Sequence, residues 1–404
     1  MESRTPYRNA QRIPELDGWR VLLVFLVSWY HIWQQSWLTP HIGSISLDFL
    51  LRSGYMPVDG TVLLSGFLLF LPYAEAMAEH SPLPSARAFY RRRVMRIVPS
   101  YYAFTLIMLF AVALPQRFYA STGDMLRDLI AHFTFTFTFT PKTYLGSPLG
   151  AASWTLCVET QMYLLFPWIA RACVKKPAAT LLGLCATGAY WRMWAMWRFT
   201  DYGMVVNQLA SFLDIYAIGM ACAIAYVQLR RAWSRLNRRH LGEVAATCVL
   251  CACLYLTVIL LKEQARSTGM DGIQSGQMLR RMPFGLLLGG CMLSLPFAVK
   301  PVRLLFGNRV MKWLSAISMN YYLLHQPLAV QLKRLHIPPY VNENPNMASE
   351  RAWQYPYTFV CFGLGILLAA LMTLLIEKPC AAGLKRAFAR MDARRQRKAA
   401  GRNA

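Results

Sequence analysis

Residues 18–37 read GWRVLLVFLVSWYHIWQQSW, a stretch long and apolar enough to cross a bilayer as a helix. Arg20 lies near the start of this stretch, and His31 lies well inside it. Ionisable side chains within a membrane span are costly, and they usually face a protein interior or a water-filled cavity. The stretch therefore predicts a membrane helix and also a polar interior that this helix lines.

Similar apolar runs recur along the 404 residues, of which 56% are hydrophobic. Such a chain is typical of an all-α, polytopic integral membrane protein, because several runs exceed the length that a bilayer requires. We predict ten transmembrane helices, and a further apolar stretch at 125–140 contains the sequence HFTFTFTFT. The ten predicted spans are approximately 18–38, 56–78, 97–115, 153–173, 178–199, 206–229, 243–262, 282–299, 310–331 and 355–377.

The basic residues decide whether 125–140 crosses the membrane, because cytoplasmic loops carry an excess of Lys and Arg. If this stretch does not cross, nearly all basic clusters fall on one side, and only Arg280 and Arg281 do not. We therefore predict cytoplasmic N- and C-termini, with 125–140 either re-entrant or lying at the outer surface. Its alternating Thr and Phe suit a strand by period, but an open strand cannot be exposed to lipid, so we favour a buried hairpin-like or helical re-entrant segment.

The formal net charge of +24 raises the question of nucleic-acid binding. The charges flank the apolar runs, so we expect contact with anionic lipid headgroups and no nucleic-acid partner. Nine of the ten cysteines lie in or beside apolar runs, where they act as small hydrophobic side chains. Cys251 and Cys253 would point to different faces of a helix, so no metal site or disulfide framework is expected.

Four titratable residues fall at similar depth in the outer halves of the predicted spans: His31, Asp59, Glu159 and His325. Each has a structural interpretation beside the functional one. A membrane histidine can simply bond a neighbouring helix, and Asp59 could cap a helix at the interface. For a fifth residue, Asp214, we favour the structural role of partner to a nearby span.

Arg20 and His31 are eleven residues apart, which at about 100° per residue returns the helix to almost the same face with a rise of roughly 16 Å. Arg93 and Arg96, three residues apart, would share a helix face if the helix of the third span begins there. An anion-binding region would thus face the cytoplasm, and a histidine–carboxylate region would face outward. Acyl-coenzyme A fits this pattern, with phosphates at one end and a thioester on a long arm. By default, however, the run RRRVMR only marks a cytoplasmic loop.

Five stretches in order resemble the membrane acyltransferase 3 family of bacterial polytopic O-acyltransferases. Thr155 replaces a usual serine and Met162 a common aromatic residue, and both changes keep the relevant hydroxyl or bulk. The likeness extends from residue 15 to about 379. The stretches are ELDGWRVLLVFLVSWYH with Arg20 and His31, PVDGTVLLSGFLL with Ser65, FYRRRVMRIVPSYY with Arg93 and Arg96, SWTLCVETQMYLLFP with Glu159 and Tyr163, and SAISMNYYLLHQPL with His325.

The resemblance implies transfer of an acyl group, usually acetyl, from cytoplasmic acyl-CoA to a hydroxyl of an extracytoplasmic or lipid-linked glycan, in a bacterial inner membrane. We expect a transmembrane domain at 1–379 followed by a basic cytoplasmic tail at 380–404, without a fused extracytoplasmic hydrolase-like domain. The expected catalytic pair is His31 as general base with Glu159 orienting it, and no metal is involved. Arg20, Arg93 and Arg96 would bind the donor phosphates. Candidates for positioning the substrate are Ser65, Tyr163, His325 and Asp59.

Two alternatives remain open at this stage. Buried charges in ten spans would also suit a transporter or flippase for an anionic or lipid-linked sugar, although we find no internal repeat of the kind that transporters show. A scaffold without chemistry would not need His31 and Glu159 at matching depth. Within the enzymatic interpretation, an acyl-histidine intermediate is a variant of the general-base mechanism.

Overall fold

A computed structural model describes residues 12–237 and 239–400 of the chain, and helices dominate it. Within these residues, each of the ten predicted spans corresponds to one long helix. The ten helices are α1 (Glu15–Ser36), α3 (Pro57–Glu79), α4 (Ala86–Met108), α7 (Trp154–Lys175), α8 (Pro177–Arg198), α9 (Leu213–Ser234), α10 (Arg239–Ala265), α11 (Met270–Ser294), α13 (Arg309–Arg334) and α14 (Arg351–Met372).

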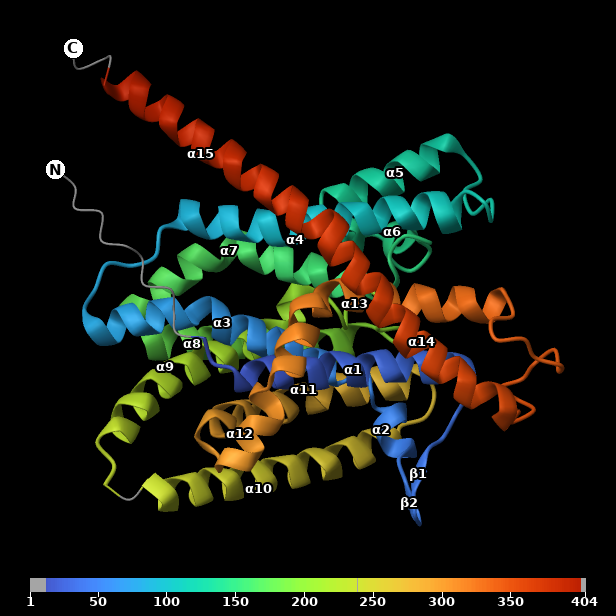
Figure 1. The fold of residues 1–404 in the computed structure, drawn as a ribbon, viewed down its shortest axis with the longest axis horizontal. Helices are drawn as coiled ribbons and strands as arrows, with labels where there is room; N and C mark the ends of the chain where they lie inside the picture. The colour runs from blue at the N-terminus through green and yellow to red at the C-terminus, as the bar shows by residue number, and fades with distance from the viewer. Residues whose placement is uncertain (1–11, 238, 401–404) are drawn as a thin grey trace.

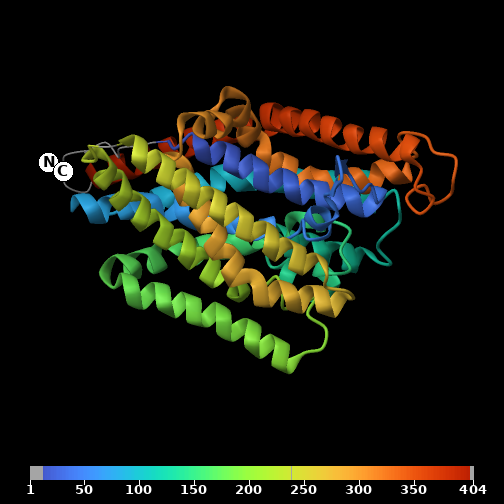
Figure 2. The same ribbon diagram turned by 90° about the horizontal axis from the view of Figure 1, so that it is seen from below.

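The long helices form one bundle and lie side by side along its long axis (Figure 1). Consecutive long helices run in opposite directions, so their connections alternate between the two ends of the bundle. We call one end the basic end; it contains the connections 80–85 and 298–308 and the basic run Arg91–Arg93 near the start of α4. The other end is the hairpin end, where the connection 37–56 contains a short β-hairpin. Turned by 90°, the bundle shows α8 and α14 on opposite flanks (Figure 2).

Five helical stretches are long and apolar enough to cross a membrane by length and composition. A sixth arises if Met270–Phe297 and Lys300–Gly307, bent by 107° at their junction, count as one broken span. Helices such as α1, α7 and α13 fall outside this set because they carry polar side chains that face other helices. The chain is thus a polytopic helical membrane protein. The five stretches are Pro57–Glu79, Ala86–Ala113, Leu209–Ser234, Arg239–Ala265 and Arg351–Arg397.

Helices α3 and α9 approach each other closely in the centre of the bundle. A Cβ atom on Gly219 of α9 would lie 2.3 Å from the backbone oxygen of Leu63, and one on Gly66 of α3 would lie 2.8 Å from that of Tyr216. Small residues allow helix backbones to meet in this way within membranes. The pair therefore forms a tightly packed wall behind the residues that α3 presents to the interior.

The predicted outer segment 125–140 does not form a membrane span. Its helix α5 (Thr122–Phe133) has twelve residues, which rise only about 18 Å against a hydrocarbon core of about 30 Å. Residues Phe137–Phe139 form a single 3₁₀ turn instead of the strand that the Thr–Phe alternation suggested. Ser121 caps α5 by accepting a hydrogen bond from the backbone N–H of Asp124. The segment packs at the hairpin end of the bundle (Figure 1).

Short elements complete the connections. The hairpin pairs β1 (His41–Ile42) with β2 (Ile45–Ser46) in antiparallel register, and Gly43 in its turn has a φ of 59°. This is a small exception to the all-α prediction. The remaining elements are α2 (Asp48–Arg52), η1 (Leu109–Ala113), η2 (Phe137–Phe139), α6 (Pro141–Tyr144), η3 (Ala151–Ser153), η4 (Leu209–Phe212), η5 (Leu295–Phe297) and α12 (Lys300–Gly307).

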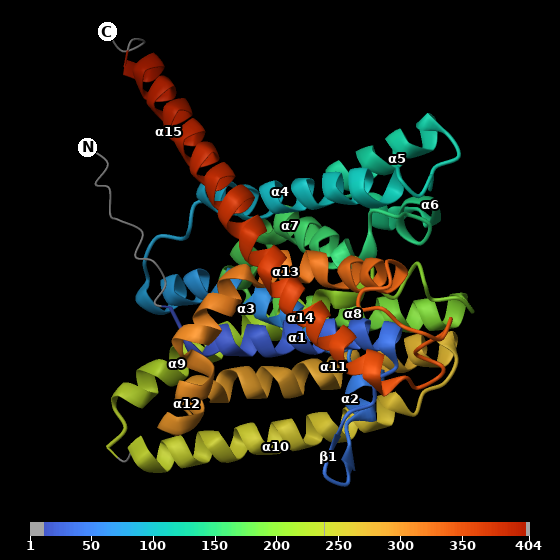
Figure 3. The ribbon, with the colours of Figure 1, turned by 45° about the vertical axis from the view of Figure 1, so that its right-hand side comes forward.

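The last span continues into the basic tail without a loop. A π-helical turn, η6 (Thr373–Glu377), joins α14 to α15 (Lys378–Ala400), and α15 projects beyond the bundle at the basic end (Figure 3). Asp392 on α15 forms ion pairs with Arg87 and Arg91 of α4. The proposed division at residue 379 thus falls inside a helix, and the described part of the tail is helical. Residues 401–404 of the predicted tail lie outside the described residues.

Two buried ion pairs join spans near the hairpin end. Asp59 of α3 lies 3.3 Å from the Nε atom of Arg281 on α11, and Asp214 of α9 lies 2.6 Å from an Nη atom of Arg192 on α8. The carboxylate of Asp214 therefore has the structural role that the sequence suggested. Arg281 has no exposed surface, which explains how a basic residue lies on the side where the charge rule does not expect one.

Candidate active site

A cavity of about 130 Å³ lies between five helices and contains most of the predicted site residues. Arg20 and Val24 enter it from α1, and Ser65 enters it from α3. Arg93 and Arg96 come from α4, Glu159 and Tyr163 from α7, and Tyr322 from α13. Arg96 is exposed, so the cavity opens where α4 reaches the basic end. Charged and aromatic side chains thus line a chamber inside a membrane protein.

The three arginines of this cavity are not neutralised by ion pairs. Within residues 12–237 and 239–400, no carboxylate oxygen lies within 4.0 Å of a guanidinium nitrogen of Arg20, Arg93 or Arg96. The Nε atom of Arg93 is buried without a hydrogen-bond partner there. Its guanidinium group instead lies over the rings of Phe89 and Tyr163, with its carbon 5.5 and 5.3 Å from their centroids. Guanidinium groups in this state can receive an anion.

Glu159 provides the negative charge of the cavity. Tyr163, one helical turn later on α7, donates a hydrogen bond of 2.7 Å to its carboxylate, and the Ser65 hydroxyl lies 3.5 Å from the Tyr163 hydroxyl. The carboxylate also interacts electrostatically with Arg96, Arg20 and Arg93, in decreasing order. Glu159 thus balances part of the arginine charge without pairing directly with any of the three.

Two histidines lie together beyond this cavity. The ring centroids of His31 on α1 and His325 on α13 are 5.2 Å apart. The ring of Tyr322 lies 5.3 Å from that of His325 and also lines the cavity. The Tyr322 side chain therefore lies between the cavity and the two histidines.

The sequence-predicted site residues thus divide into groups. Arg20, Arg93, Arg96, Glu159, Ser65 and Tyr163 meet in the cavity, and His31 meets His325. The predicted contact between His31 and Glu159 is absent. The Nδ1 atom of His31 lies 2.8 Å from the amide oxygen of Gln34 instead. The reason is the rotation of α7 about its axis, which directs Glu159 toward the arginines of α1 and α4, so its proposed role of orienting His31 is not supported.

Asp59 also has a different place from the one predicted. Its carboxylate is fully buried against Arg281, and Arg281 also lies over the ring of Phe212 and donates to the Ser211 hydroxyl. Asp59 is not among the residues that line the cavity. This aspartate fixes α3 against α11, and a role in positioning substrate is not supported.

Sequence reasoning missed a carboxylate behind Arg96. Glu377, in the π-helical turn η6, accepts a hydrogen bond of 2.7 Å from the side-chain amide of Asn320 and interacts electrostatically with Arg96. Asn320 also donates to the Thr373 hydroxyl. Wide turns of this kind occur often at functional sites. The sequence carries no local signal for a π-helical turn, although a glutamate at the end of an apolar run was visible.

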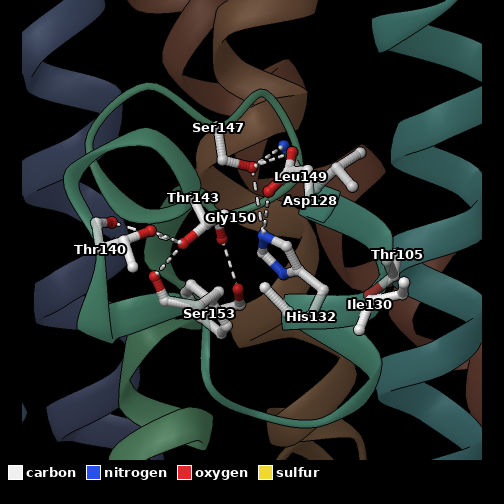
Figure 4. Close-up of polar contacts among 12 residues, drawn as sticks. Thr105, Asp128, Ile130, His132, Thr140, Thr143, Ser147, Leu149, Gly150 and Ser153 are labelled. Carbon is white, nitrogen blue, oxygen red and sulfur yellow. Dashed lines mark hydrogen bonds and ion pairs between the residues drawn. The ribbon is translucent and has the colours of Figure 1, made fainter. Parts of the chain in front are cut away.

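A second polar cluster, also missed, lies at the hairpin end around His132 of α5 (Figure 4). Its Nε2 atom lies 3.1 Å from the Ser147 hydroxyl, which is 2.7 Å from the Asp128 carboxylate. Its Nδ1 atom lies 2.8 Å from the Tyr101 hydroxyl of α4. Tyr119 donates to the same carboxylate. These bonds connect α4, α5 and the loop that precedes α7.

The electrostatics of this cluster follow from its burial. Burial lowers the pKa of His132 to about 3, so the imidazole is neutral at ordinary pH. Burial also raises the pKa of Asp128, against the opposing effect of the hydroxyl groups of Tyr119 and Ser147. A hydroxyl can give its proton to a carboxylate while accepting one from an imidazole N–H, so the chain of bonds is satisfied without a charged histidine.

Among the described residues, no group of three or more His, Cys, Asp or Glu side chains could hold a metal ion.

The chain is similar in sequence to several proteins that are named as acetyltransferases or acyltransferases. The chain is 23% identical over 343 residues to the peptidoglycan O-acetyltransferase OatA of Listeria monocytogenes, which covers 80% of this chain and 50% of the relative. It is 28% identical over 180 residues to the acyltransferase MdmB of Streptomyces mycarofaciens, covering 44% of each chain. It is also 25% identical over 229 residues to a putative acetyltransferase, ORF330, of Acidianus two-tailed virus, covering 55% of this chain and 60% of the relative.

The chain thus spans about half the length of the curated relatives it matches. No solved structure matches it. The model of the acyltransferase domain of the acyltransferase 3 family matches residues 13–375, which include every residue of the cavity and both histidines. The chain therefore belongs to the acyltransferase 3 family.

Proposed function

We propose that this chain is a membrane O-acyltransferase that moves an acyl group, preferentially acetyl, from acyl-CoA to a hydroxyl of an extracytoplasmic or lipid-linked glycan. The basic end faces the cytoplasm of a bacterial inner membrane and receives the donor, and the hairpin end faces the acceptor. The excess of Lys and Arg at the basic end supports this orientation. The printed name of the Listeria relative supports O-acetyl transfer to a glycan.

One relationship supports this proposal most directly. Arg20 lines the arginine cavity, and His31 follows eleven residues later on the same face of α1, a rise of roughly 16 Å. An anion-binding group and a proton acceptor thus occupy one helix face at two depths. A donor with phosphates at one end and a thioester at the end of a flexible arm can span this separation.

The cavity fits the phosphates of the donor by its charge. Arg20, Arg93 and Arg96 carry three positive charges against the single carboxylate of Glu159, and the Nε atom of Arg93 is buried without a partner among the described residues. Phosphate oxygens would accept the charge-assisted hydrogen bonds that these guanidinium groups can donate. Glu159 limits the repulsion among the arginines while the donor is absent.

His31 performs the proton transfer in this mechanism. Its imidazole accepts the proton of the acceptor hydroxyl while the hydroxyl oxygen attacks the thioester carbonyl carbon. The carbon–sulfur bond then breaks, and the thiolate of CoA takes up the proton that the His31 imidazolium holds, so that the products are an ester, free CoA thiol and the regenerated imidazole. Ser65 and Tyr163, whose hydroxyls enter the cavity, position the pantetheine arm or the acyl oxygen. His325 keeps a second neutral imidazole beside the base.

The test measures acyl transfer by the purified protein in lipid nanodiscs, using radiolabelled acetyl-CoA, a glycan acceptor and detection of released CoA thiol. We expect His31→Ala to abolish both product formation and thiol release. His41→Ala, at an exposed histidine of the hairpin, is the matched control and should leave both unchanged. A burst of thiol release without acceptor would assign the reaction to an acyl-histidine intermediate.

The same assay separates this proposal from transport. A carrier of anionic or lipid-linked sugars would move its cargo without releasing CoA thiol. Full transfer activity in His31→Ala, with a folded protein confirmed by size-exclusion chromatography, would overturn the proposed mechanism.

A further inference from the structure

The side chains that surround His31 on its own helix determine where its proton lies. The Nδ1 atom of His31 is 2.8 Å from the amide oxygen of Gln34, three residues later on α1. The amide nitrogen of Gln34 donates a hydrogen bond of 2.8 Å to the hydroxyl of Tyr30. One glutamine side chain thus bridges the residue before the histidine and the histidine itself.

This arrangement fixes one tautomer of the imidazole. An amide oxygen can only accept a hydrogen bond, and the amide NH₂ group of Gln34 is turned toward Tyr30. With the amide in this orientation, the Nδ1 atom of His31 carries the proton and donates it to Gln34. A neutral imidazole with a proton on Nδ1 leaves the lone pair on Nε2, at the opposite side of the ring.

His325 shows the same pattern with a different partner. Its Nδ1 atom lies 2.6 Å from the backbone carbonyl oxygen of Tyr322, which can only accept, so this nitrogen is also protonated. Its Nε2 atom is buried and has no hydrogen-bond partner in the part of the chain that the structure describes. The two neighbouring rings therefore both keep a proton on Nδ1 and an available lone pair on Nε2.

We infer that Gln34 is a positioning residue for the transfer reaction, a conclusion that rests on the function proposed above. Gln34 holds His31 in the Nδ1–H tautomer and fixes its ring, so that Nε2 receives the proton of the acceptor hydroxyl. Tyr30 fixes the orientation of the Gln34 amide. The base is thus oriented by a neutral amide on its own helix, and the carboxylate of Glu159 remains free for the arginine cavity.

A structural explanation of the same contacts makes different predictions. If Gln34 and Tyr30 only satisfied each other at the end of α1, their replacement would change stability and leave the pH dependence of turnover unaltered. Gln34 is exposed, so its substitution does not open a cavity in the core. Variants at this position should therefore fold, which makes kinetic measurements informative.

The experiment compares Gln34→Leu and Gln34→Glu with the unmodified protein, in the nanodisc assay with acetyl-CoA. Gln34→Leu removes the acceptor for Nδ1–H, so kcat should fall at least tenfold while the KM for acetyl-CoA stays within twofold. Gln34→Glu keeps an acceptor but adds a charge that stabilises the protonated imidazole. It should retain most of the turnover at high pH, with the acidic limb of the kcat profile moved to higher pH by about one unit.

Gln35→Leu is the matched control, because it changes the neighbouring glutamine, whose side chain has no hydrogen bond to His31; its kinetics should not change. Nitrogen NMR of histidine-labelled protein should also show His31 protonated at Nδ1, and Tyr30→Phe should weaken this preference. Unaltered kcat and pH profile in both Gln34 variants, or an Nε2–H tautomer in the unmodified protein, would overturn the inference. Such a result would leave the proposed function intact, provided that His31→Ala is inactive in the same assay.

Discussion

Asp59 and Arg281 form an ion pair across α3 and α11, with a separation of 3.3 Å and no exposed surface on either side chain. The pair lies near the hairpin end of the bundle and is fully buried, where an unpaired charge would be costly. The sequence suggested Asp59 as a site residue and Arg281 as an exception to the expected distribution of basic residues. Their ion pair explains why each is found within the bundle.

We expect Asp59→Leu alone to lower the free energy of unfolding by about 3–5 kcal/mol, because it leaves the Arg281 charge buried without its partner. The double variant Asp59→Leu/Arg281→Met should recover most of this loss. Thermal denaturation in detergent measures the stability, and the transfer assay measures activity in the double variant. A stable double variant without activity would contradict the structural role and restore Asp59 as a site residue.

Arg93→Ala should raise the KM for acetyl-CoA by about 10- to 100-fold, since a charge-assisted hydrogen bond to phosphate contributes about 1.5–3 kcal/mol. Arg93→Lys keeps the charge but loses the planar guanidinium group, so its KM should lie between those of the unmodified protein and Arg93→Ala. The measurement is the dependence of transfer rate on donor concentration. Arg309→Ala, at an exposed arginine of the same end, is the control. An unchanged KM with a lower kcat would contradict a role in donor binding.

The cluster around His132 should make the hairpin end sensitive to acid. The unfolded imidazole takes up a proton near pH 6.5, whereas burial holds the folded pKa at about 3. Stability should therefore fall as pH drops from about 6.5 toward 3, with a slope of up to about 1.4 kcal/mol per pH unit, and this group should have no effect above that window. Hydrogen exchange of α5 and its neighbouring loop measures the change.

His132→Asn removes the titrating group but keeps a polar side chain, so its stability should be lower at neutral pH and depend less on pH. Asp128 is present in both proteins, so its own opposing protonation cancels in the comparison. Equal pH slopes in the two proteins would show that His132 does not remain neutral in the folded state.

The orientation of the bundle can be tested with introduced cysteines. A membrane-impermeant maleimide applied to intact spheroplasts should label Ser44→Cys, in the exposed hairpin, and should not label Ser81→Cys, at the basic end. Both should react after the membrane is permeabilised. The reverse pattern would invert the proposed orientation, and labelling of both in intact spheroplasts would contradict a membrane-spanning bundle.

Gly219→Val should destabilise the protein by several kcal/mol, because even a Cβ atom would lie 2.3 Å from the Leu63 oxygen and α3 would have to move. Since α3 also carries Ser65, activity should fall together with stability. Gly363→Val, at a glycine of α14 with no atom within 4 Å of an added Cβ, is the control. A fully stable Gly219→Val protein would contradict the close α3–α9 contact.

The helical architecture was predictable from sequence because apolar length is a local property. All ten predicted spans correspond to helices, and the charge rule placed residues 125–140 outside the set of crossings. Family motifs and helical spacing also indicated that three arginines act together, and the structure places them in one cavity: Arg20, Arg93 and Arg96. These features depend on periodicity along single segments, which one sequence displays directly.

The partners of individual side chains were not predictable in the same way. Equal depth suggested that Glu159 faces His31, but depth does not fix the rotation of α7 about its axis. With the rotation that α7 adopts, Glu159 contacts Tyr163 and faces the arginines. His31 contacts Gln34 instead. Glu377 lies in a π-helical turn. The extra residue in this turn changes which helix face the following residues occupy, and such a turn has no sequence signature.

The continuous passage from α14 into α15 places the carboxyl-terminal helix against α4, one of the helices that line the cavity. Asp392 forms ion pairs with Arg87 and Arg91 near the start of α4. Helix α4 also carries Arg93 and Arg96 a few residues later. A binding event at the tail would therefore act on the start of α4, and through this helix on the proposed donor site at Arg93 and Arg96.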